Sequence, residues 1–296
     1  MRLTDNLTGA ALMTVCVLAY VVNDAVMKLL CADMALIQAV FLRGLITIPL
    51  LCLIVWRSKA AIRGLSHQNK WFVALRVGAE TGATIAFLTA LKHMPLANVS
   101  AILLALPLAV TMAAALFLGE PIGWRRWSAI IVGFAGVLIV IRPGLEGFNI
   151  YSLSALVAVA FITLREITTR RLTSDVPSLT VALWTTIGIT MFSAVIMAGT
   201  EWRAVGQLSW LLLLGAAVAI LFGSLLSVMA MRVGEISFVA PFRYTAMVWA
   251  IALGILIFGE WPDQPTLIGT GIIIATGIYS LHREQQRRRM AEAKQG

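Results

Sequence analysis

An unbroken stretch without a charged side chain, residues 98–117, constrains the fold of this chain more than any other feature. About twenty residues of α-helix extend about 30 Å, which is the thickness of the hydrocarbon core of a lipid bilayer. A Gly119-Glu120-Pro121 turn follows the stretch, and a second apolar run follows the turn. The sequence therefore predicts a helical hairpin that crosses a membrane.

The sequence pattern of this hairpin is repeated later in the chain. When the two copies are aligned, several positions match without a gap, namely Lys92 with Arg232, Val99 with Val239, and Gly119-Glu120 with Gly259-Glu260. Further back in the chain, residues 27–41 also align with residues 169–183. A membrane hairpin that is repeated within one chain is typical of transporters built from two related halves.

The composition agrees with an integral membrane protein. Of the 296 residues, 60% are hydrophobic and 12% are charged, whereas soluble domains carry about 25% charged residues. Ten runs approach the ~20 residues that a bilayer requires. The predicted spans are residues 7–30, 35–56, 71–91, 98–117, 127–141, 152–169, 179–198, 210–231, 237–258 and 267–279.

We therefore predict an all-α integral membrane protein with ten transmembrane helices. Residues 1–145 form the first five-helix repeat, residues 146–283 the second, and residues 284–296 a basic cytoplasmic tail. Because five is an odd number, the two repeats run through the membrane in opposite directions. Inverted repeats of this kind usually place the substrate site near the midplane, between the halves.

The distribution of basic residues predicts the orientation. Placing both termini in the cytoplasm puts fifteen basic residues inside and four, Lys28, Lys92, Arg142 and Arg203, outside. The inner set is Arg2, Arg57, Lys59, Arg63, Lys70, Arg125, Arg126, Arg170, Arg171, Arg232, Arg283, Arg287, Arg288, Arg289 and Lys294. This bias predicts cytoplasmic termini. The net charge of +9 is spread over loops and tail, so it indicates contact with anionic lipid and not a nucleic-acid partner.

Other classes of protein are disfavoured by what the sequence lacks. The three cysteines have no metal-type spacing, and the three histidines fall at span ends or in loops. No catalytic constellation, metal site, cofactor site or phosphate-binding glycine loop is found, so neither an intramembrane enzyme nor an ATP-driven pump is expected. A passive scaffold would leave both the repeat and the charges inside the spans unexplained.

With these features the sequence resembles the drug/metabolite transporter superfamily in its ten-helix EamA-type form. The resemblance rests on the two hairpin turns, on Arg43 after Phe41-Leu42, and on residues 241–244, Pro-Phe-Arg-Tyr. It implies a secondary transporter of the bacterial inner membrane, similar to YddG-type exporters of aromatic amino acids and other amphipathic metabolites. An importer of a vitamin or nucleotide precursor on the same fold is the alternative, because the motifs do not name a substrate.

Seven ionisable residues are expected inside the spans: Asp24, Arg43, Arg76, Glu80, Arg165, Glu166 and Arg243. Each costs about 2.5–3.5 kcal/mol at the centre of a membrane helix, so they should face the protein interior. Counting ~1.5 Å per residue from the middle of each span puts Asp24 and Arg43 toward the outer side. Arg76, Arg165, Glu166 and Arg243 then lie about 7–8 Å to the inner side, with Glu80 near the midplane.

These depths predict two gating layers. The alignment of residues 27–41 with residues 169–183, continued toward the N-terminus, places Asp24 on Glu166, and inversion of the repeat carries an outer position to an inner one. We expect Asp24 with Arg43 in the outer layer, and Glu166 with Arg76 or Arg243 in the inner layer. The alternative is a set of static ion pairs, in which Arg76 and Glu80, four residues apart on one helix, satisfy each other.

Aromatic and amide side chains near the middle of the spans supply substrate-binding candidates. With Glu80 they are Tyr20, Asn23, Trp184, Tyr244 and Trp249. Such rings stack on aromatic substrates or hold an organic cation, although ordinary helix packing is the alternative for each ring.

Prolines and small residues complete the set of predictions. Pro107 near the centre of its span is the predicted hinge, because proline removes a helical hydrogen bond. Pro241 is close to the start of its span, where proline is more easily tolerated. The pairs Ala129 with Gly133 and Gly271 with Ala275 predict close helix contacts, inside one protomer or in a homodimer.

Overall fold

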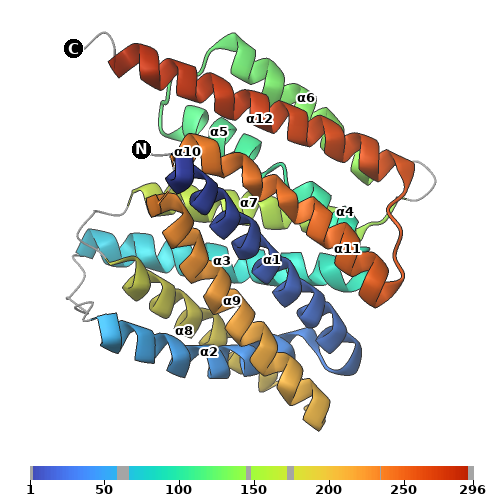
Figure 1. Cartoon of the computed structure of the whole chain (residues 1–296). Coiled ribbons are helices and arrows are strands. Elements are labelled where there is room, and N and C mark those ends of the chain that lie inside the picture. The colour runs from blue at the N-terminus through green and yellow to red at the C-terminus, as the bar shows by residue number, and fades with distance from the viewer. Residues whose placement is uncertain (1–2, 59–66, 145–147, 172–176, 234, 293–296) are drawn as a thin grey trace. The chain divides into compact units, whose positions relative to one another are not determined.

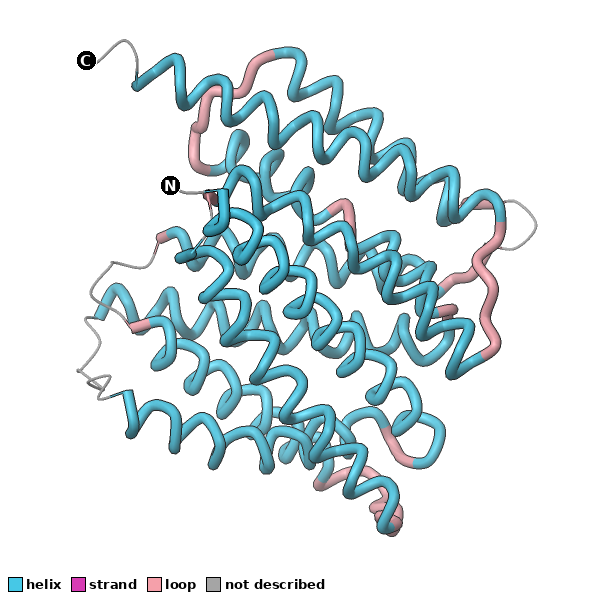
Figure 2. The backbone as a smooth tube through the Cα atoms, viewed as in Figure 1, coloured by secondary structure: helices cyan, strands magenta, loops and turns pink. Residues whose placement is uncertain are grey.

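The computed structural model describes residues 3–58, 67–144, 148–171, 177–233 and 235–292 of the chain. Within these ranges all regular structure is helical (Figure 2). The segments are α1 (Leu3–Asp33), α2 (Leu36–Ser58), α3 (His67–His93), α4 (Leu96–Leu103), α5 (Leu106–Phe117), α6 (Trp124–Ile141), α7 (Tyr151–Arg170), α8 (Ser178–Met197), α9 (Gln207–Val233), α10 (Ile236–Val239), the 3-10 helix η1 (Ala240–Thr245), α11 (Ala246–Phe258) and α12 (Gln264–Glu292).

Ten segments are long and apolar enough to cross a membrane, which confirms the predicted number of spans. Some of the helix ends differ from the predicted ends of the spans. Helix α1 extends to Asp33, and α12 continues through Glu292 into the residues that were predicted to form a separate tail. Of the basic residues used for the orientation, Arg2, Lys59, Arg63 and Lys294 lie outside the described residues.

Two compact units emerge from the contacts within the chain. Unit 1 comprises Met1–Val21, Met94–Ser152 and Phe222–Gly296, and unit 2 comprises Val22–His93 and Leu153–Leu221. Each unit draws helices from both halves of the sequence. The units are therefore a different division of the chain from the two sequence repeats.

In unit 2, helix α2 packs along α8, and α3 contacts the same helix (Figure 1). Leu51 and Val55 of α2 and Leu183 of α8 form a buried apolar cluster. A side chain at Gly44 of α2 would collide with Thr190 of α8, so glycine lets the two helices approach closely.

In unit 1, the most extensive contact between two helices joins α6 to α12 (Figure 1). At Gly136 an added Cβ would lie 2.9 Å from the carbonyl oxygen of Gly269, so the two backbones meet here. Gly133 faces Leu108 and Thr276 inside the same unit, whereas Gly271 has open space around it. Gly133, of the predicted pair with Ala129, therefore packs against helices of the same protomer. A homodimer through Gly271 and Ala275 stays a prediction.

The repeated hairpin turn has the same geometry in both copies. Gly119 and Gly259 adopt φ angles of +68° and +66°, which glycine adopts at little cost. The following amide nitrogens, of Glu120 and Glu260, donate to the carbonyl oxygens of Ala114 and Gly254 at 3.3 and 3.0 Å. Both helices thus end at a glycine in the left-handed conformation, which is a common helix C-terminus, and the recurrence of this end in the second hairpin agrees with duplicated halves.

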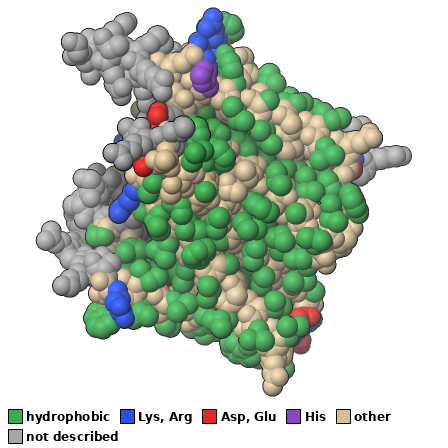
Figure 3. Space-filling model, viewed as in Figure 1, with side chains coloured by type: hydrophobic (Ala, Val, Ile, Leu, Met, Phe, Trp, Pro, Cys, Tyr) green, Lys and Arg blue, Asp and Glu red, His purple; other side chains and the backbone are tan. Residues whose placement is uncertain are grey.

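Apolar side chains cover most of the visible face in the space-filling view (Figure 3). Large apolar side chains are exposed on several helices, for example Val195 (75%) and Leu256 (79%). A soluble monomer rarely exposes so many large apolar side chains, whereas the hydrocarbon core of a bilayer solvates them well.

Candidate functional site

The fourth span of the first half is discontinuous. Helix α4 ends at Leu103 and α5 begins at Leu106, with a turn between them. Pro107 occupies the first turn of α5, where proline is tolerated because the first amide nitrogens of a helix have no intrahelical acceptor. The helix is therefore broken just before the predicted hinge residue, whose hinge role remains a prediction.

The corresponding span of the second half is also discontinuous, which the sequence argument on Pro241 did not anticipate. Pro241 lies near the start of η1, a short 3-10 segment between α10 and α11. Pro241 stands at the first positions of this segment, where proline is tolerated because the first amide nitrogens have no intrahelical acceptor. When the two hairpins are aligned, η1 lies over residues 100–105, which contain the break before α5. Interrupted helices at corresponding positions of two halves are the strongest sequence-level indicator of a transporter binding site.

The interrupted span of η1 and α11 carries two buried donors. Tyr244 is 6% exposed, and a side chain at Gly277 of α12 would collide with its hydroxyl oxygen. Among the described residues, neither the Tyr244 hydroxyl nor Nε1 of Trp249 has a hydrogen-bond partner. A buried donor without a partner is costly, so these two groups are suited to an acceptor on a ligand or water.

Arg243 and Tyr20 also belong to unit 1. The Arg243 side chain is exposed, and no hydrogen bond or ion pair joins its guanidinium to the described residues. The Tyr20 hydroxyl donates to Oγ of Ser224 at 3.3 Å, and its ring lies against Gly223 of α9. Tyr20 is therefore engaged by α9.

The charged group predicted for the outer layer lies in unit 2 and is joined through Asn23. Nδ2 of Asn23 donates to the Asp24 carboxylate at 3.0 Å, and Nη1 of Arg43 donates to Oδ1 of Asn23 at 3.1 Å. Asn23 is 4% exposed. This amide, a predicted substrate-binding group, thus connects the predicted pair of Asp24 and Arg43.

The charged group predicted for the inner layer centres on Arg165, which the sequence places inside a span without a gating role. Its Nη1 contacts both carboxylate oxygens of Glu80, at 3.0 and 2.8 Å, and its Nη2 contacts Glu166 at 2.7 Å. Arg76, a predicted partner of Glu166, donates instead to the Thr169 hydroxyl and interacts with Glu166 electrostatically. The direct partner of Glu166 is therefore its sequence neighbour.

The two charged groups are electrostatically linked within unit 2. Arg43 interacts with Glu80 as well as with Asp24. Three carboxylates and three guanidiniums balance one another in this network, which consists of Asp24, Arg43, Arg76, Glu80, Arg165 and Glu166. Both groups of contacts are formed in one and the same structure. The gating role of each residue stays a prediction.

The remaining candidates do not gather in one unit. Trp184, 45% exposed on α8, lies in unit 2 with Asn23 and Glu80, whereas Tyr20, Tyr244 and Trp249 lie in unit 1. Among the described residues, no group of three or more histidine, cysteine, aspartate or glutamate side chains is placed to hold a metal ion.

Two interrupted spans and a charge-balanced interior on ten membrane helices define a membrane transporter. Residues 7–142 and 149–281 each match the EamA-like transporter family, so the chain belongs to this family. It is a multi-pass secondary transporter of small metabolites from the drug/metabolite transporter superfamily, and not an enzyme.

Individual relatives carry different substrates. The chain is 30% identical over 227 residues to a riboflavin transporter of Vibrio cholerae, covering 76% of this chain and 75% of the relative. It is 25% identical over 289 residues, 96% of each chain, to an S-adenosylmethionine uptake transporter of Rickettsia conorii. It is also 25% identical to the pseudopaline exporter CntI of Pseudomonas aeruginosa, over 94% of this chain and 97% of the relative.

The fold is also found among solved structures. A crystal structure of a protein that is 16% identical in sequence matches with a TM-score of 0.66, covering 97% of this chain and 99% of that one. This likeness concerns the fold alone.

Proposed function

We propose that this protein takes up a small metabolite that combines a planar nitrogen heterocycle with a polar chain. Riboflavin and S-adenosylmethionine both have this chemistry, and they are the compounds carried by the Vibrio cholerae and Rickettsia conorii relatives. The similarity to these two carriers is the observation on which the proposal rests. It favours the vitamin or nucleotide-precursor importer over the amino-acid exporter that the sequence motifs first suggested.

The interrupted span of η1 and α11 offers suitable chemistry. A Tyr or Trp ring stacked on a heterocycle contributes roughly 0.5–1.5 kcal/mol beyond the area that it buries. The Tyr244 hydroxyl and Nε1 of Trp249 are donors without a partner among the described residues, and heterocycles and ribose chains carry acceptors for such donors.

Ligand binding to the purified protein tests this proposal. Riboflavin and S-adenosylmethionine, compared with phenylalanine, are titrated against the wild type, Tyr244→Phe and Trp249→Phe. Loss of one hydrogen bond should weaken heterocycle binding about fivefold, since such a bond is worth roughly 1 kcal/mol. Trp261→Phe, a change of the same type at a loop residue that is 77% exposed, should have no effect. Binding of phenylalanine alone would contradict the proposal.

Export of aromatic or other apolar amino acids is the second candidate. The similarity to a pseudopaline exporter favours the outward direction, and the exposed Arg243 guanidinium suits a substrate carboxylate. In that case Arg243→Gln should abolish amino-acid transport, whereas heterocycle uptake should be changed little.

We also propose an orientation and a location. Both termini lie in the cytoplasm and the protein resides in the bacterial plasma membrane, on the strength of the bias of fifteen basic residues against four. A cysteine placed at Lys70 should then be labelled only from the cytoplasmic side. Labelling from the outside would show that the orientation is the opposite of the proposed one.

A further inference from the structure

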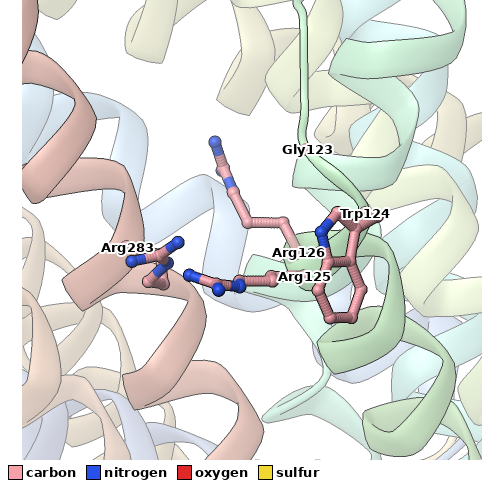
Figure 4. A pocket seen from close by; sticks show the side chains of 5 residues that line it. All are labelled: Gly123, Trp124, Arg125, Arg126 and Arg283. Carbon is pink, nitrogen blue, oxygen red and sulfur yellow. The ribbon is translucent and has the colours of Figure 1, made fainter.

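Three arginines and one tryptophan line a pocket of about 220 Å³ between helices α6 and α12 of unit 1. Gly123, Trp124, Arg125 and Arg126 come from the start of α6, and Arg283 comes from α12 (Figure 4). Pockets for drug-sized ligands measure about 300–1,000 Å³. This smaller pocket therefore fits a compact group such as a phosphate.

Like charges face one another across this pocket. Arg125 extends from α6 toward Arg283 on α12 (Figure 4). Among the described side chains, which do not include that of Glu284, neither arginine has a carboxylate at ion-pair distance. The Arg283 guanidinium donates a 2.8 Å hydrogen bond to Gln286. Two guanidiniums held this close repel each other, and an anion between them removes the repulsion.

The pocket is organised before any ligand arrives. The Arg125 guanidinium lies 5.5 Å from the centre of the Trp124 ring, a distance at which cation–π attraction holds it in place. Gly123 is the N-cap of α6 and provides no side-chain cap, so the first amide groups of the helix add positive potential. Arg126, from the same turn, also lines the pocket and is only 8% exposed.

The position along the helices points to the lipid headgroups. The Trp124 side chain is 75% exposed, and tryptophan prefers the boundary between hydrocarbon and water. The pocket lies at the start of one membrane-spanning helix and at the end of the span Gln264–Arg283. Residues 283–294 carry five basic and two acidic residues, which favours an anionic surface further.

We propose that this pocket binds the phosphate group of an anionic phospholipid. Basic pockets between membrane helices recognise lipid headgroups, and guanidiniums bind phosphate oxygens in pairs. The bound lipid would hold the start of α6 against α12 near Arg283. The same two helices already approach each other closely at Gly136 and Gly269. A soluble phosphate ester has the same chemistry, so the experiment compares the two sources.

Native mass spectrometry of the purified full-length protein tests the proposal. Dioctanoyl phosphatidylglycerol is titrated, with dioctanoyl phosphatidylcholine as the uncharged comparison and glycerol phosphate as the soluble one. The double variant Arg125→Gln with Arg283→Gln should lose phosphatidylglycerol affinity about 25-fold, or fivefold per arginine. The matched variant Arg57→Gln with Lys70→Gln removes two exposed charges outside the pocket. It should lose less than about threefold, because these charges do not line the pocket and exposed charges are screened by salt.

Two further variants keep the result interpretable. Arg125→Lys with Arg283→Lys should retain most of the lipid affinity, which separates loss of charge from loss of fold. The single glutamine variants give the loss per arginine if the double variant cannot be purified. Equal losses in the pocket and control variants, or equal binding of phosphatidylcholine, would overturn the proposal. Binding of glycerol phosphate with the same arginine dependence and no preference for the lipid would assign the pocket to a soluble anion and overturn it too.

Discussion

Nη1 of Arg165 on α7 contacts both carboxylate oxygens of Glu80 on α3, at 3.0 and 2.8 Å. Their side chains are 25% and 21% exposed. The second nitrogen of the same guanidinium reaches Glu166 at 2.7 Å. One arginine therefore pairs with two carboxylates and joins two membrane helices that are far apart in the sequence.

Neutralising Glu80 should destabilise the protein. Glu80→Gln leaves Arg165 with one carboxylate fewer in a mostly buried setting, and the loss should be about 1–3 kcal/mol after allowing for partial exposure. The melting temperature in detergent measures this loss. Glu201→Gln, at an exposed loop position, is the matched control, and equal melting temperatures for both variants would mean that the ion pair contributes no stability.

The two predicted gating layers can be tested by opposite effects. Asp24→Asn should favour the outward-open state and Glu166→Gln the inward-open state, because each variant loses one closing contact. A contact worth about 1–2 kcal/mol changes the ratio of the two states roughly five- to thirtyfold. Labelling of a reporter cysteine, in a background without Cys16, Cys31 and Cys52, measures the direction. Shifts in the same direction would reject the two-layer mechanism and favour static ion pairs.

Gly277 and Tyr244 should be energetically coupled. Gly277→Ala adds a methyl group that collides with the Tyr244 hydroxyl, so it should lower the melting temperature. Tyr244→Phe removes the colliding oxygen, and the double variant should regain part of the loss, with a coupling of about 0.5–3 kcal/mol. Gly271→Ala, where the new methyl meets open space, should not destabilise. Additive effects of the two single changes would show that the ring moves aside freely.

The Asp263 carboxylate outside the spans gives a prediction about pH. Burial raises the pKa of Asp263, but hydrogen bonds from Thr266 and the contact with Arg142 outweigh it, so the net pKa lies below the ordinary 3.8. A depressed pKa stabilises the folded state above the unfolded-state pKa, and this contribution is lost as pH falls through the folded-state pKa.

Asp263→Asn isolates this charge, since asparagine can still cap the start of α12. The side chain is 43% exposed, so the variant should lose only about 0.5 kcal/mol at neutral pH. The difference from the wild type should shrink as pH falls below about 4. Melting curves from pH 3 to 7 measure it, and Arg142→Gln should show the same trend. A difference that is constant over this range would exclude the charge as its cause.

The architecture could be predicted because bilayer thickness fixes helix length. Ten apolar runs and a repeated Gly-Glu turn are local features, and the structure has ten candidate spans with the same turn geometry at Gly119 and Gly259. The extension of α12 to Glu292 was missed because its polar end continues a helix without the apolar signal that marks a span.

The details of the site depend on tertiary contacts, which depth along a helix does not determine. Sequence position placed Asp24 and Arg43 at one level but did not reveal Asn23 between them. The sequence places Arg165 inside a span, but its pairing with Glu80 and not with another carboxylate depends on how α3 and α7 pack. The sequence places three acidic and four basic residues inside the spans, so it does not show that Arg243 stands apart from the charge-balanced network. The sequence does not predict the 3-10 segment at Pro241, because a proline close to the start of a span is usually tolerated without a break in the helix.

Solute exchange in proteoliposomes tests the central claim, transport of a heterocyclic metabolite, most directly. Vesicles that contain the purified protein are preloaded with unlabelled riboflavin, S-adenosylmethionine or phenylalanine, and entry of the matching labelled compound is followed. We predict exchange of riboflavin or S-adenosylmethionine above the level of protein-free vesicles, with Tyr244→Phe and Trp249→Phe reducing it and Trp261→Phe leaving it unchanged. Exchange of phenylalanine with no exchange of either heterocycle would contradict the account.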